Sequence, residues 1–185
     1  MSERLDQSTP ASLPPSDASE SADGPVAVRQ FVGFEVAGQT YAFPIEQIQE
    51  IVVLEQITRL PQVPDFIDGV SNLRGSIIPV VNLRGLMGYP QVDDRSTDRI
   101  VVVTVGDRII GCRVDGVSQV NHFSDDQIQT PPDLVTPKGG QYLLGLVQRE
   151  SEVIVLLNAD ELLEPSKLDA VHQSLTALRS GDNVP

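Results

Sequence analysis

The sequence contains two copies of one pattern. A block at residues 69–87 recurs without a gap 76 positions downstream, at residues 145–163. The two blocks read GVSNLRGSIIPVVNLRGLM and GLVQRESEVIVLLNADELL. A second pair, offset by 69 positions, aligns residues 31–51 with residues 100–120. Because both blocks keep their order along the chain, one structural unit is built twice, and the fold must accommodate two similar halves.

Each half has the pattern of short antiparallel strands. Apolar and polar residues alternate over runs of four to seven residues, which is typical of strands with one buried face. Fourteen glycines and 14 prolines separate these runs. Strands of this length with frequent turns favour small barrels over a parallel sheet. The expected hairpins pair residues 31–36 with 40–43, 69–73 with 77–81, 100–105 with 109–114, and 142–147 with 153–157.

Short helices are expected between the hairpins. Pro44 precedes apolar residues at helical spacing, Ile45, Ile48, Ile51 and Val52, so a short helix is predicted there. Its counterpart in the second copy is residues 115–120. Later in each copy, an asparagine stands where an N-cap would begin a helical turn. These are Asn82, before a turn that ends near Gly88, and Asn158, before the predicted helix 159–163.

Composition divides the chain into three parts. Residues 1–27 are rich in Ser, Pro, Asp and Glu and poor in bulky apolar groups, so a disordered tail is expected. One folded domain is expected over residues 28–164, with the two copies at about 31–88 and 100–163. Residues 165–185 are expected to form a C-terminal tail with a short amphipathic helix at 167–178.

Charge and cysteine content exclude several classes of function. The net charge of −13 disfavours binding to nucleic acids and to anionic membranes, because both require clustered Lys and Arg. A single cysteine, Cys112, excludes an internal disulfide framework, and its strand pattern points it inward. No apolar run is long enough to insert into a membrane, and no apolar leader begins the chain. We therefore expect a cytoplasmic protein.

The sequence contains little that could support catalysis. The only histidines are His122 and His172, and a histidine general base would need a Ser, Cys or Thr nucleophile brought near it. Asp125 and Asp126 are expected to be a solvated acidic pair. No phosphate-binding glycine loop or dinucleotide fingerprint is present, and nothing predicts a metal or cofactor. An enzyme or a small-ligand domain is therefore disfavoured.

An arginine beside a glycine distinguishes the first copy from the second. Arg74 and Gly75 of the first copy align with Glu150 and Ser151 of the second. A strand connection tolerates either pair, so the arginine can mark a surface added for binding. Glu50 is the expected partner of Arg74. The alternative is an ordinary surface ion pair without a binding role.

The sequence resembles the CheW family of chemotaxis coupling proteins from residue 30 to about residue 164. The resemblance is carried by several short motifs together. These are FVGFEVAGQTYAFPIEQIQEI at 31–51, Leu60-Pro61 with Pro64, Gly69-Val70, Asn72-Leu73-Arg74-Gly75, Pro79-Val80, Leu83-Arg84, Val114-Asp115-Gly116-Val117, and Tyr142 with Gly145. The family resemblance implies a mainly β fold of two intertwined five-stranded, SH3-like β-barrels.

The resemblance also implies a function without catalysis. Members of the family are adaptors that join the cytoplasmic tip of methyl-accepting chemoreceptors to the regulatory domain of the histidine kinase CheA. By position, the resemblance implies a receptor-binding surface that includes Ile48, Glu50, Gly69 and Arg74. Two further positions, Gly111 and Gly145, are expected to be structural glycines. The resemblance places the protein in the cytoplasm, at membrane receptor arrays.

Two points stay open at the level of the sequence. Many family members have Asp where this chain has Asn82. The chain could also serve a related receptor–kinase array that controls pilus motility or gene expression instead of flagellar chemotaxis.

Overall fold

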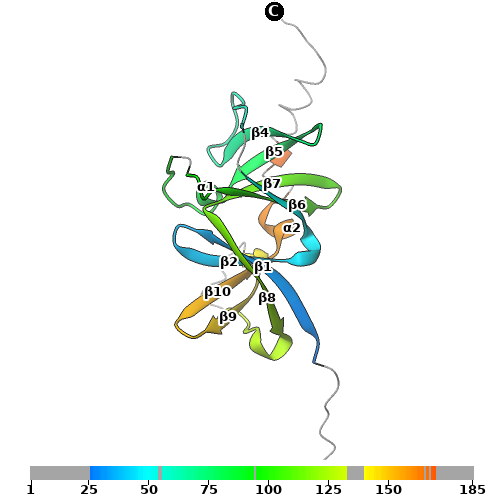
Figure 1. Ribbon diagram of the computed structural model, residues 1–185, viewed down its shortest axis with the longest axis vertical. Coiled ribbons are helices and arrows are strands. Elements are labelled where there is room, and N and C mark those ends of the chain that lie inside the picture. The colour runs from blue at the N-terminus through cyan, green and yellow to red at the C-terminus, as the bar shows by residue number, and fades with distance from the viewer. Residues whose placement is uncertain are drawn as a thin grey trace, which may run out of the picture.

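The computed structural model describes residues 26–53, 56–93, 95–132, 140–164, 166 and 168–169. Within these residues the protein is mainly β, with two five-stranded sheets stacked along the long axis of the molecule (Figure 1). Sheet A has the strand order β8-β1-β2-β10-β9, and sheet B has the order β3-β6-β7-β5-β4. The strands of sheet A are β1 (Val28–Val36), β2 (Gln39–Pro44), β8 (Gly116–Ser124), β9 (Leu143–Arg149) and β10 (Glu152–Leu157). The strands of sheet B are β3 (Ile48–Val53), β4 (Ile67–Leu73), β5 (Ser76–Asn82), β6 (Arg99–Val105) and β7 (Arg108–Val114).

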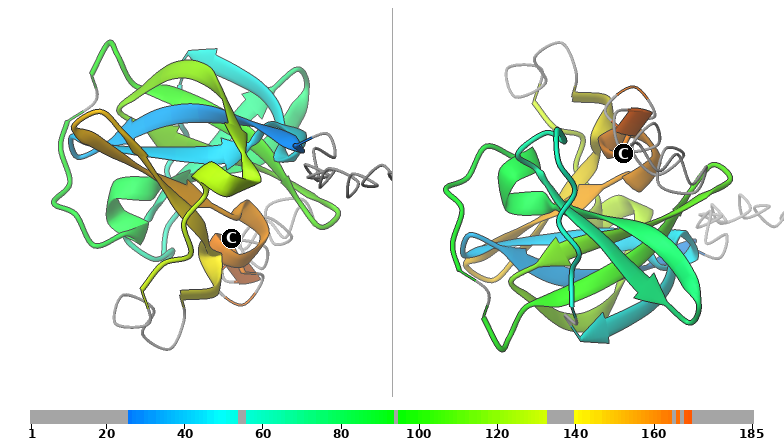
Figure 2. Two further views of the ribbon diagram at one scale, coloured as in Figure 1. Left: turned by 90° about the horizontal axis from the view of Figure 1, so that it is seen from below. Right: turned by 90° about the horizontal axis from the view of Figure 1, so that it is seen from above.

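The two copies exchange their first hairpins. Hairpin β1–β2 of the first copy lies in sheet A with β8, β9 and β10 of the second copy. Hairpin β6–β7 of the second copy lies in sheet B with β3, β4 and β5 of the first. The exchange is made by two parallel pairs, β10 with β2 and β5 with β7. Views from below and above show the strands of the two sheets crossing (Figure 2). The expectation of two intertwined five-stranded units is therefore confirmed.

Each sheet curls so that its two edges approach one another. After edge strand β3 the chain returns to the other edge of sheet B, where Thr58 and Val70 exchange two backbone hydrogen bonds of 2.8 and 2.9 Å. After β8 the same happens in sheet A, where Gln129 and Leu146 exchange bonds of 2.8 and 2.9 Å. The equivalent bridges complete a small barrel in each half and cover strand edges that would otherwise be exposed.

The alternation along each strand creates three apolar cores. One face of β5 or β10 packs inside its own barrel, where Ile78 and Ile154 occupy equivalent positions. The opposite face packs into a larger core between the sheets, where Val81 and Leu157 are equivalent. This shared core also buries the sulfur-bearing side chain of Cys112. Because the strands bury both faces, the barrels cannot separate without exposing apolar surface to water.

The helix predicted from Ile45 to Val52 is wrong. Only a 3-10 turn, η1 (Ile45–Gln47), precedes β3, which pairs antiparallel with β6. The residues of β3 alternate between half-buried and exposed, as in an edge strand. Apolar residues at three- and four-residue spacing suggested a helix, but Ile and Val favour strands, and sheet B offers β6 as a partner. The matching prediction for residues 115–120 is wrong for the same reason, because that segment forms the start of β8.

Both predicted asparagine caps are confirmed. The Asn82 side chain accepts hydrogen bonds from the backbone N–H groups of Arg84 and Gly85, at 3.0 and 3.4 Å, and begins α1 (Leu83–Leu86). Asn158 accepts from the backbone N–H of Asp160 at 3.0 Å and begins α2 (Ala159–Leu162). Two further 3-10 turns are η2 (Asp125–Gln127) and η4 (Gly140–Tyr142).

The chain termini lie largely outside the described residues. Of the helix predicted at 167–178, Leu168 and Asp169 are described; both are helical, and Leu168 is buried against the shared core. The rest of that prediction, and residues 1–25 of the tail predicted over residues 1–27, lie outside the described part of the chain.

Candidate functional site

The turn between β4 and β5 presents Arg74 to solvent. Arg74 has a left-handed backbone conformation with φ 51°, and Gly75 follows with φ 89°. Two successive positive φ values produce a turn whose twist matches that of the flanking strands. The Gly75 N–H donates a 2.8 Å hydrogen bond to the Asn72 side chain, which holds the turn in place. The backbone around Arg74 is therefore well defined although its side chain is 79% exposed.

Arg74 forms a two-pronged ion pair with Glu50 of β3. Its Nε lies 3.1 Å from Glu50 Oε1, and its Nη2 lies 2.9 Å from Oε2. This contact is the one expected from the sequence. The hydrogen bond from Arg74 lowers the pKa of Glu50, because it favours the charged carboxylate. The pair joins the tip of one hairpin to the edge strand of sheet B.

A small pocket lies beside this ion pair, at the open end of barrel B. We call it the Arg74 pocket. Its volume is about 220 Å³. Its floor contains Val52, Leu73 and Ile100, which belong to or pack against the apolar core of that barrel. The complete lining is Glu50, Val52, Val53, Ser71, Asn72, Leu73, Arg74 and Ile100. An apolar side chain from a partner could enter here while its neighbours meet the charged rim.

The other two predicted binding residues lie deeper in sheet B. Ile48 is half-buried at the start of β3 and packs against the shared core. Gly69 is buried in β4, with φ 142°, where the returning chain crosses it. A Cβ atom at Gly69 would lie 2.1 Å from the Thr58 carbonyl oxygen. Glu50 and Arg74 are thus in direct contact, whereas Gly69 does not line their pocket.

The predicted structural glycines have equally crowded surroundings. A Cβ at Gly111 would lie 2.7 Å from Ile100 Cγ2, inside barrel B. A Cβ at Gly145 would lie 2.4 Å from Ile128 Cγ2 and 3.1 Å from the Gln129 carbonyl oxygen. Gly145 and Gly69 therefore have the same task in the two copies: each lets the returning segment bridge to an edge strand.

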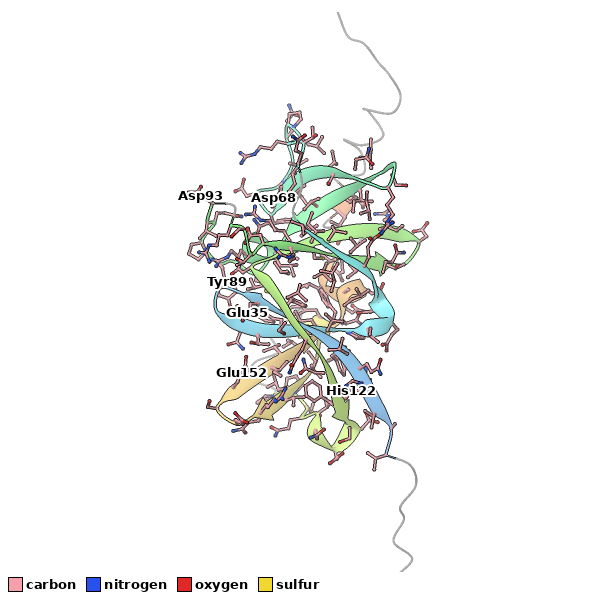
Figure 3. All side chains as sticks on the ribbon, viewed as in Figure 1. Glu35, Asp68, Tyr89, Asp93, His122 and Glu152 are labelled. Carbon is pink, nitrogen blue, oxygen red and sulfur yellow. The ribbon has the colours of Figure 1, made fainter. Side chains whose placement is uncertain are left out.

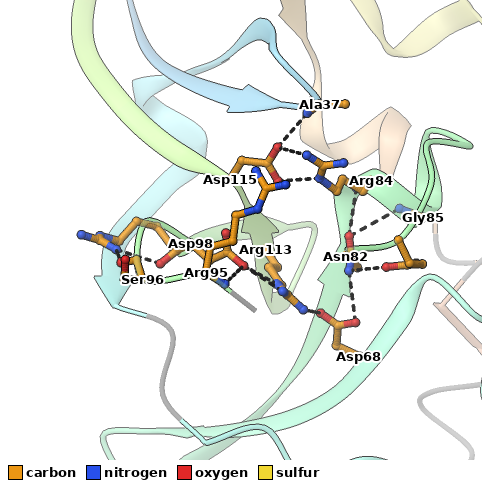
Figure 4. Close-up of polar contacts among 12 residues, drawn as sticks. Ala37, Asp68, Asn82, Arg84, Gly85, Arg95, Ser96, Asp98, Arg113 and Asp115 are labelled. Carbon is orange, nitrogen blue, oxygen red and sulfur yellow. Dashed lines mark hydrogen bonds and ion pairs between the residues drawn. The ribbon is translucent and has the colours of Figure 1, made fainter. Parts of the chain in front are cut away.

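Arg84 has an internal role that the sequence did not reveal. Its Nε and Nη2 donate to the two Asp115 oxygens at 2.7 and 2.6 Å, and Asp115 also accepts from the Ala37 N–H at 2.8 Å (Figure 4). Burial would raise the pKa of Asp115, but the hydrogen bonds from Arg84 and Ala37 outweigh it and lower the pKa. The trio joins α1, the β1–β2 turn of sheet A and the chain after β7. Arg84 and Asp115 therefore connect the two sheets, and we call this ion pair the Arg84–Asp115 tie.

The second copy makes an equivalent connection between the sheets with different residues. Asp160, which aligns with Arg84, accepts from the Gly106 N–H at 3.1 Å and from Gln47 Nε2 at 3.0 Å. Gly106 aligns with Ala37, so in both copies a carboxylate receives the turn N–H of the exchanged hairpin. Only the residue that supplies the carboxylate differs. The aligned sequences contain a signal for this pattern. Asp115 aligns with Glu46, and Arg84 aligns with Asp160, so the acidic residues are distributed differently in the two copies.

A second internal charge cluster surrounds Arg113 on β7. Its Nη2 lies 2.8 Å from Asp98, and its Nη1 lies 3.1 Å from Asp68. Asp98 is 2% exposed, so this pair is buried (Figure 4). Asp68 also accepts from Asn82 Nδ2 at 3.2 Å, which connects the cluster to the cap of α1. Arg113 and Arg84 thus have interior roles, in contrast to Arg74.

Nothing in the described residues resembles a catalytic or metal centre. They contain no group of three or more His, Cys, Asp or Glu side chains placed to hold a metal ion. Burial raises the pKa of the Cys112 thiol, so it is no nucleophile at neutral pH. His122 is exposed on β8 and contacts the Gln30 side chain at 3.1 Å. Among the described helices, none has the length and apolar content needed to span a membrane.

Comparison with known proteins agrees with this fold. Residues 30–167 match the model of the CheW-like domain. The chain belongs to the CheW family. It is 32% identical over 148 residues to the chemotaxis protein CheW of Klebsiella aerogenes, with 80% of this chain and 89% of that protein covered. CheW-family proteins are non-catalytic scaffolds.

A solved structure and a more distant relative complete the comparison. The scaffolding protein TtCheW of Thermoanaerobacter tengcongensis superimposes with a TM-score of 0.69 at 28% identity, covering 76% of this chain and 96% of that protein. Protein PilI of Pseudomonas aeruginosa is 32% identical over 103 residues, which cover 55% of this chain and 58% of PilI. The matches to CheW proteins thus extend over more of the fold.

Proposed function

We propose that this CheW-family scaffold couples the cytoplasmic tips of chemoreceptors to the regulatory domain of the histidine kinase CheA. Such a protein acts at the cytoplasmic face of membrane receptor arrays. The observation that supports this function best is the Arg74 pocket, a shaped surface with an apolar floor and a charged rim. Many modest contacts of this kind gain strength when they are repeated across an array.

The receptor-binding surface in this proposal centres on Arg74 and Glu50, with Ile48 and Gly69 as supports. The exposed guanidinium can still donate hydrogen bonds outward while Glu50 holds it in place. Exposed apolar residues, Ile51 on β3 and Ile77 on β5, add contact area in sheet B. A helical receptor segment could place one apolar side chain in the pocket and its polar neighbours on the rim.

The Arg74–Glu50 pair is not explained by stability alone. Solvent-exposed ion pairs contribute little to folding. The arginine also adopts a left-handed backbone conformation that costs energy in any residue with a Cβ atom. Glu150 adopts the same conformation at the equivalent turn, so the fold sets the backbone there. The choice of an arginine in only one copy is what favours a binding role.

Co-sedimentation with receptor-containing membranes in the presence of CheA tests the proposal. We expect the intact chain to sediment with both partners and the Arg74→Ala variant to sediment about tenfold less, since a charged hydrogen-bonding group is lost. Glu150→Ala, at the equivalent turn of the second copy, is the matched control and should behave as the intact chain. Failure of the intact chain to bind either partner would contradict the proposal.

A second candidate is the coupling protein of a pilus-related receptor array. The match to PilI supports this candidate, although that match covers a smaller part of the chain. The two candidates differ in their partners and not in their chemistry. Capture of partners from cell extract with the intact chain, followed by identification of the kinase, distinguishes between them.

A further inference from the structure

The repeat places a second pocket at the open end of barrel A. We call it the Arg149 pocket. Its volume is about 350 Å³, and residues of β8, η2 and β9 line it. The lining is Gln119, Val120, Asn121, His122, Phe123, Gln127, Val147, Gln148 and Arg149. Six of these positions match the lining of the Arg74 pocket, namely 119, 121, 122, 147, 148 and 149 against 50, 52, 53, 71, 72 and 73.

The two pockets share a position in the fold but differ in chemistry. Where the Arg74 pocket has Val52 and Leu73 in its floor, the Arg149 pocket has Asn121 and Arg149. His122 also replaces Val53. Barrel folding is compatible with the apolar residues of the first copy, so it does not require the polar residues of the second. The change of three neighbouring positions points to a different ligand.

A buried amide holds the Arg149 guanidinium at the pocket mouth. Arg149 Nη1 donates to Asn121 Oδ1 at 3.1 Å, and Asn121 is only 5% exposed. Asn121 Nδ2 donates to the Gln119 carbonyl oxygen at 3.2 Å. Gly33 of β1 makes room, because a Cβ there would lie 3.1 Å from Asn121 Nδ2. The polar group is therefore positioned by the barrel and does not depend on a flexible surface contact.

The lining of this pocket has a cation but no carboxylate. Within the described part of the chain the hydrogen-bond partner of Arg149 is a neutral amide, whereas Arg74 faces Glu50. A guanidinium has five donors in a planar fork that fits a carboxylate. The nearest acid across the strands, Glu152 of β10, lies opposite Arg149 in the same unit as His122 (Figure 3), and it accepts a hydrogen bond from the Thr40 hydroxyl.

We propose that the Arg149 pocket is a second docking site, which binds the carboxylate of an Asp or Glu side chain on a partner protein. Phe123 and Val147 form its apolar floor and receive the methylene groups of that side chain. The scaffold then has one docking surface in each barrel, each suited to a different side chain. This site does not depend on the receptor-binding role given to the Arg74 pocket.

Nuclear magnetic resonance titration of the 15N-labelled full chain tests this site. The probe is a short acetylated and amidated peptide of alternating glutamate and alanine, and its control is the same peptide with glutamine. We expect saturable shifts in the backbone amides of residues 119–123 and 147–149 with the glutamate peptide only. Added salt should weaken these shifts, since the contact is between charges. Arg149→Gln should weaken binding about tenfold.

Two variants separate this role from a structural one. Arg149→Lys keeps the charge but loses the planar fork, so its affinity should lie between those of the intact chain and Arg149→Gln. It serves as the main comparison if Arg149→Gln does not fold. Arg59→Gln, an exposed arginine of the other unit, should bind as the intact chain. Equal shifts with both peptides, shifts centred elsewhere, or unchanged affinity in the Arg149 variants would overturn the proposal.

Discussion

Arg74 and Glu150 have the same left-handed backbone conformation at equivalent turns, with φ 51° and φ 52°. They lie 76 positions apart in the aligned blocks of the repeat. The fold therefore requires this backbone conformation in both copies, but it does not determine the side chain. Glycine would adopt the conformation without strain, and neither copy uses it. The arginine in one copy and the glutamate in the other point to different surface roles.

Replacing Arg74 with glycine should separate binding from folding. Arg74→Gly relaxes the left-handed backbone and removes only a weak surface ion pair, so the thermal midpoint should stay within about 2 °C or rise. Receptor coupling in the co-sedimentation assay should fall about tenfold. Glu150→Gly should keep both the thermal midpoint and the receptor coupling of the intact chain. A large drop in the midpoint of Arg74→Gly would favour a structural role for the arginine.

Alanine at the bridging glycines should destabilise the two barrels unequally. Gly69→Ala would place a methyl group on the Thr58 carbonyl in a strained conformation, whereas Gly145→Ala mainly displaces the Ile128 side chain. We expect losses in the free energy of unfolding of about 3 kcal/mol and about 1–2 kcal/mol, respectively. Denaturant titration measures both. Gly116→Ala, with its nearest contact at 4.0 Å, is the control, and an equal loss there would refute the crowding argument.

The Arg84–Asp115 tie should make stability depend on acid pH. The pKa of Asp115 is lowered on folding, so its contribution is fully present above the ordinary value of 3.8 and is lost as the pH falls through the folded-state value. Asp115→Asn should lower the free energy of unfolding by about 1–3 kcal/mol at neutral pH. The difference in the free energy of unfolding between the intact chain and Asp115→Asn should become smaller below pH 3.8. Unfolding curves measured across this pH range test the direction of the change. A difference that grows as the pH falls would contradict the prediction.

Cys112 should be unreactive in the native protein. Its side chain is fully buried in the shared core, and burial raises the pKa of the thiol. A thiol reagent should therefore label it only when the two sheets separate, so labelling should follow global unfolding. Labelling rates measured across a denaturant series test this prediction. Fast labelling without denaturant would show that the sheets open locally.

Several features of this protein followed from local patterns. The repeat and its alternation predicted the hairpins, and the copy-specific Arg74 predicted its contact with Glu50. Family resemblance supplied the expected function. Gly69 was assigned to a binding surface, and the structure adds that it faces the Thr58 carbonyl in the same way that Gly145 faces its own bridging segment.

The strand at 48–53 and the two interior arginines needed the folded structure. Apolar spacing alone allowed a helix from Ile45, and only the presence of β6 beside it decides for a strand. Arg84 and Arg74 are both followed by glycine in the sequence. One is bound to Asp115 between the sheets, and the other extends into solvent.

The sequence by itself determined that two β units exist and which faces of their strands are apolar, because alternation is a property of neighbouring residues. The tertiary structure alone decided that the copies exchange hairpins and that Asn121, His122 and Arg149 gather at one barrel mouth. Parallel pairing of β2 with β10 and of β5 with β7 joins strands distant in the chain. Such pairs depend on the packing of the whole molecule, and no local pattern specifies them.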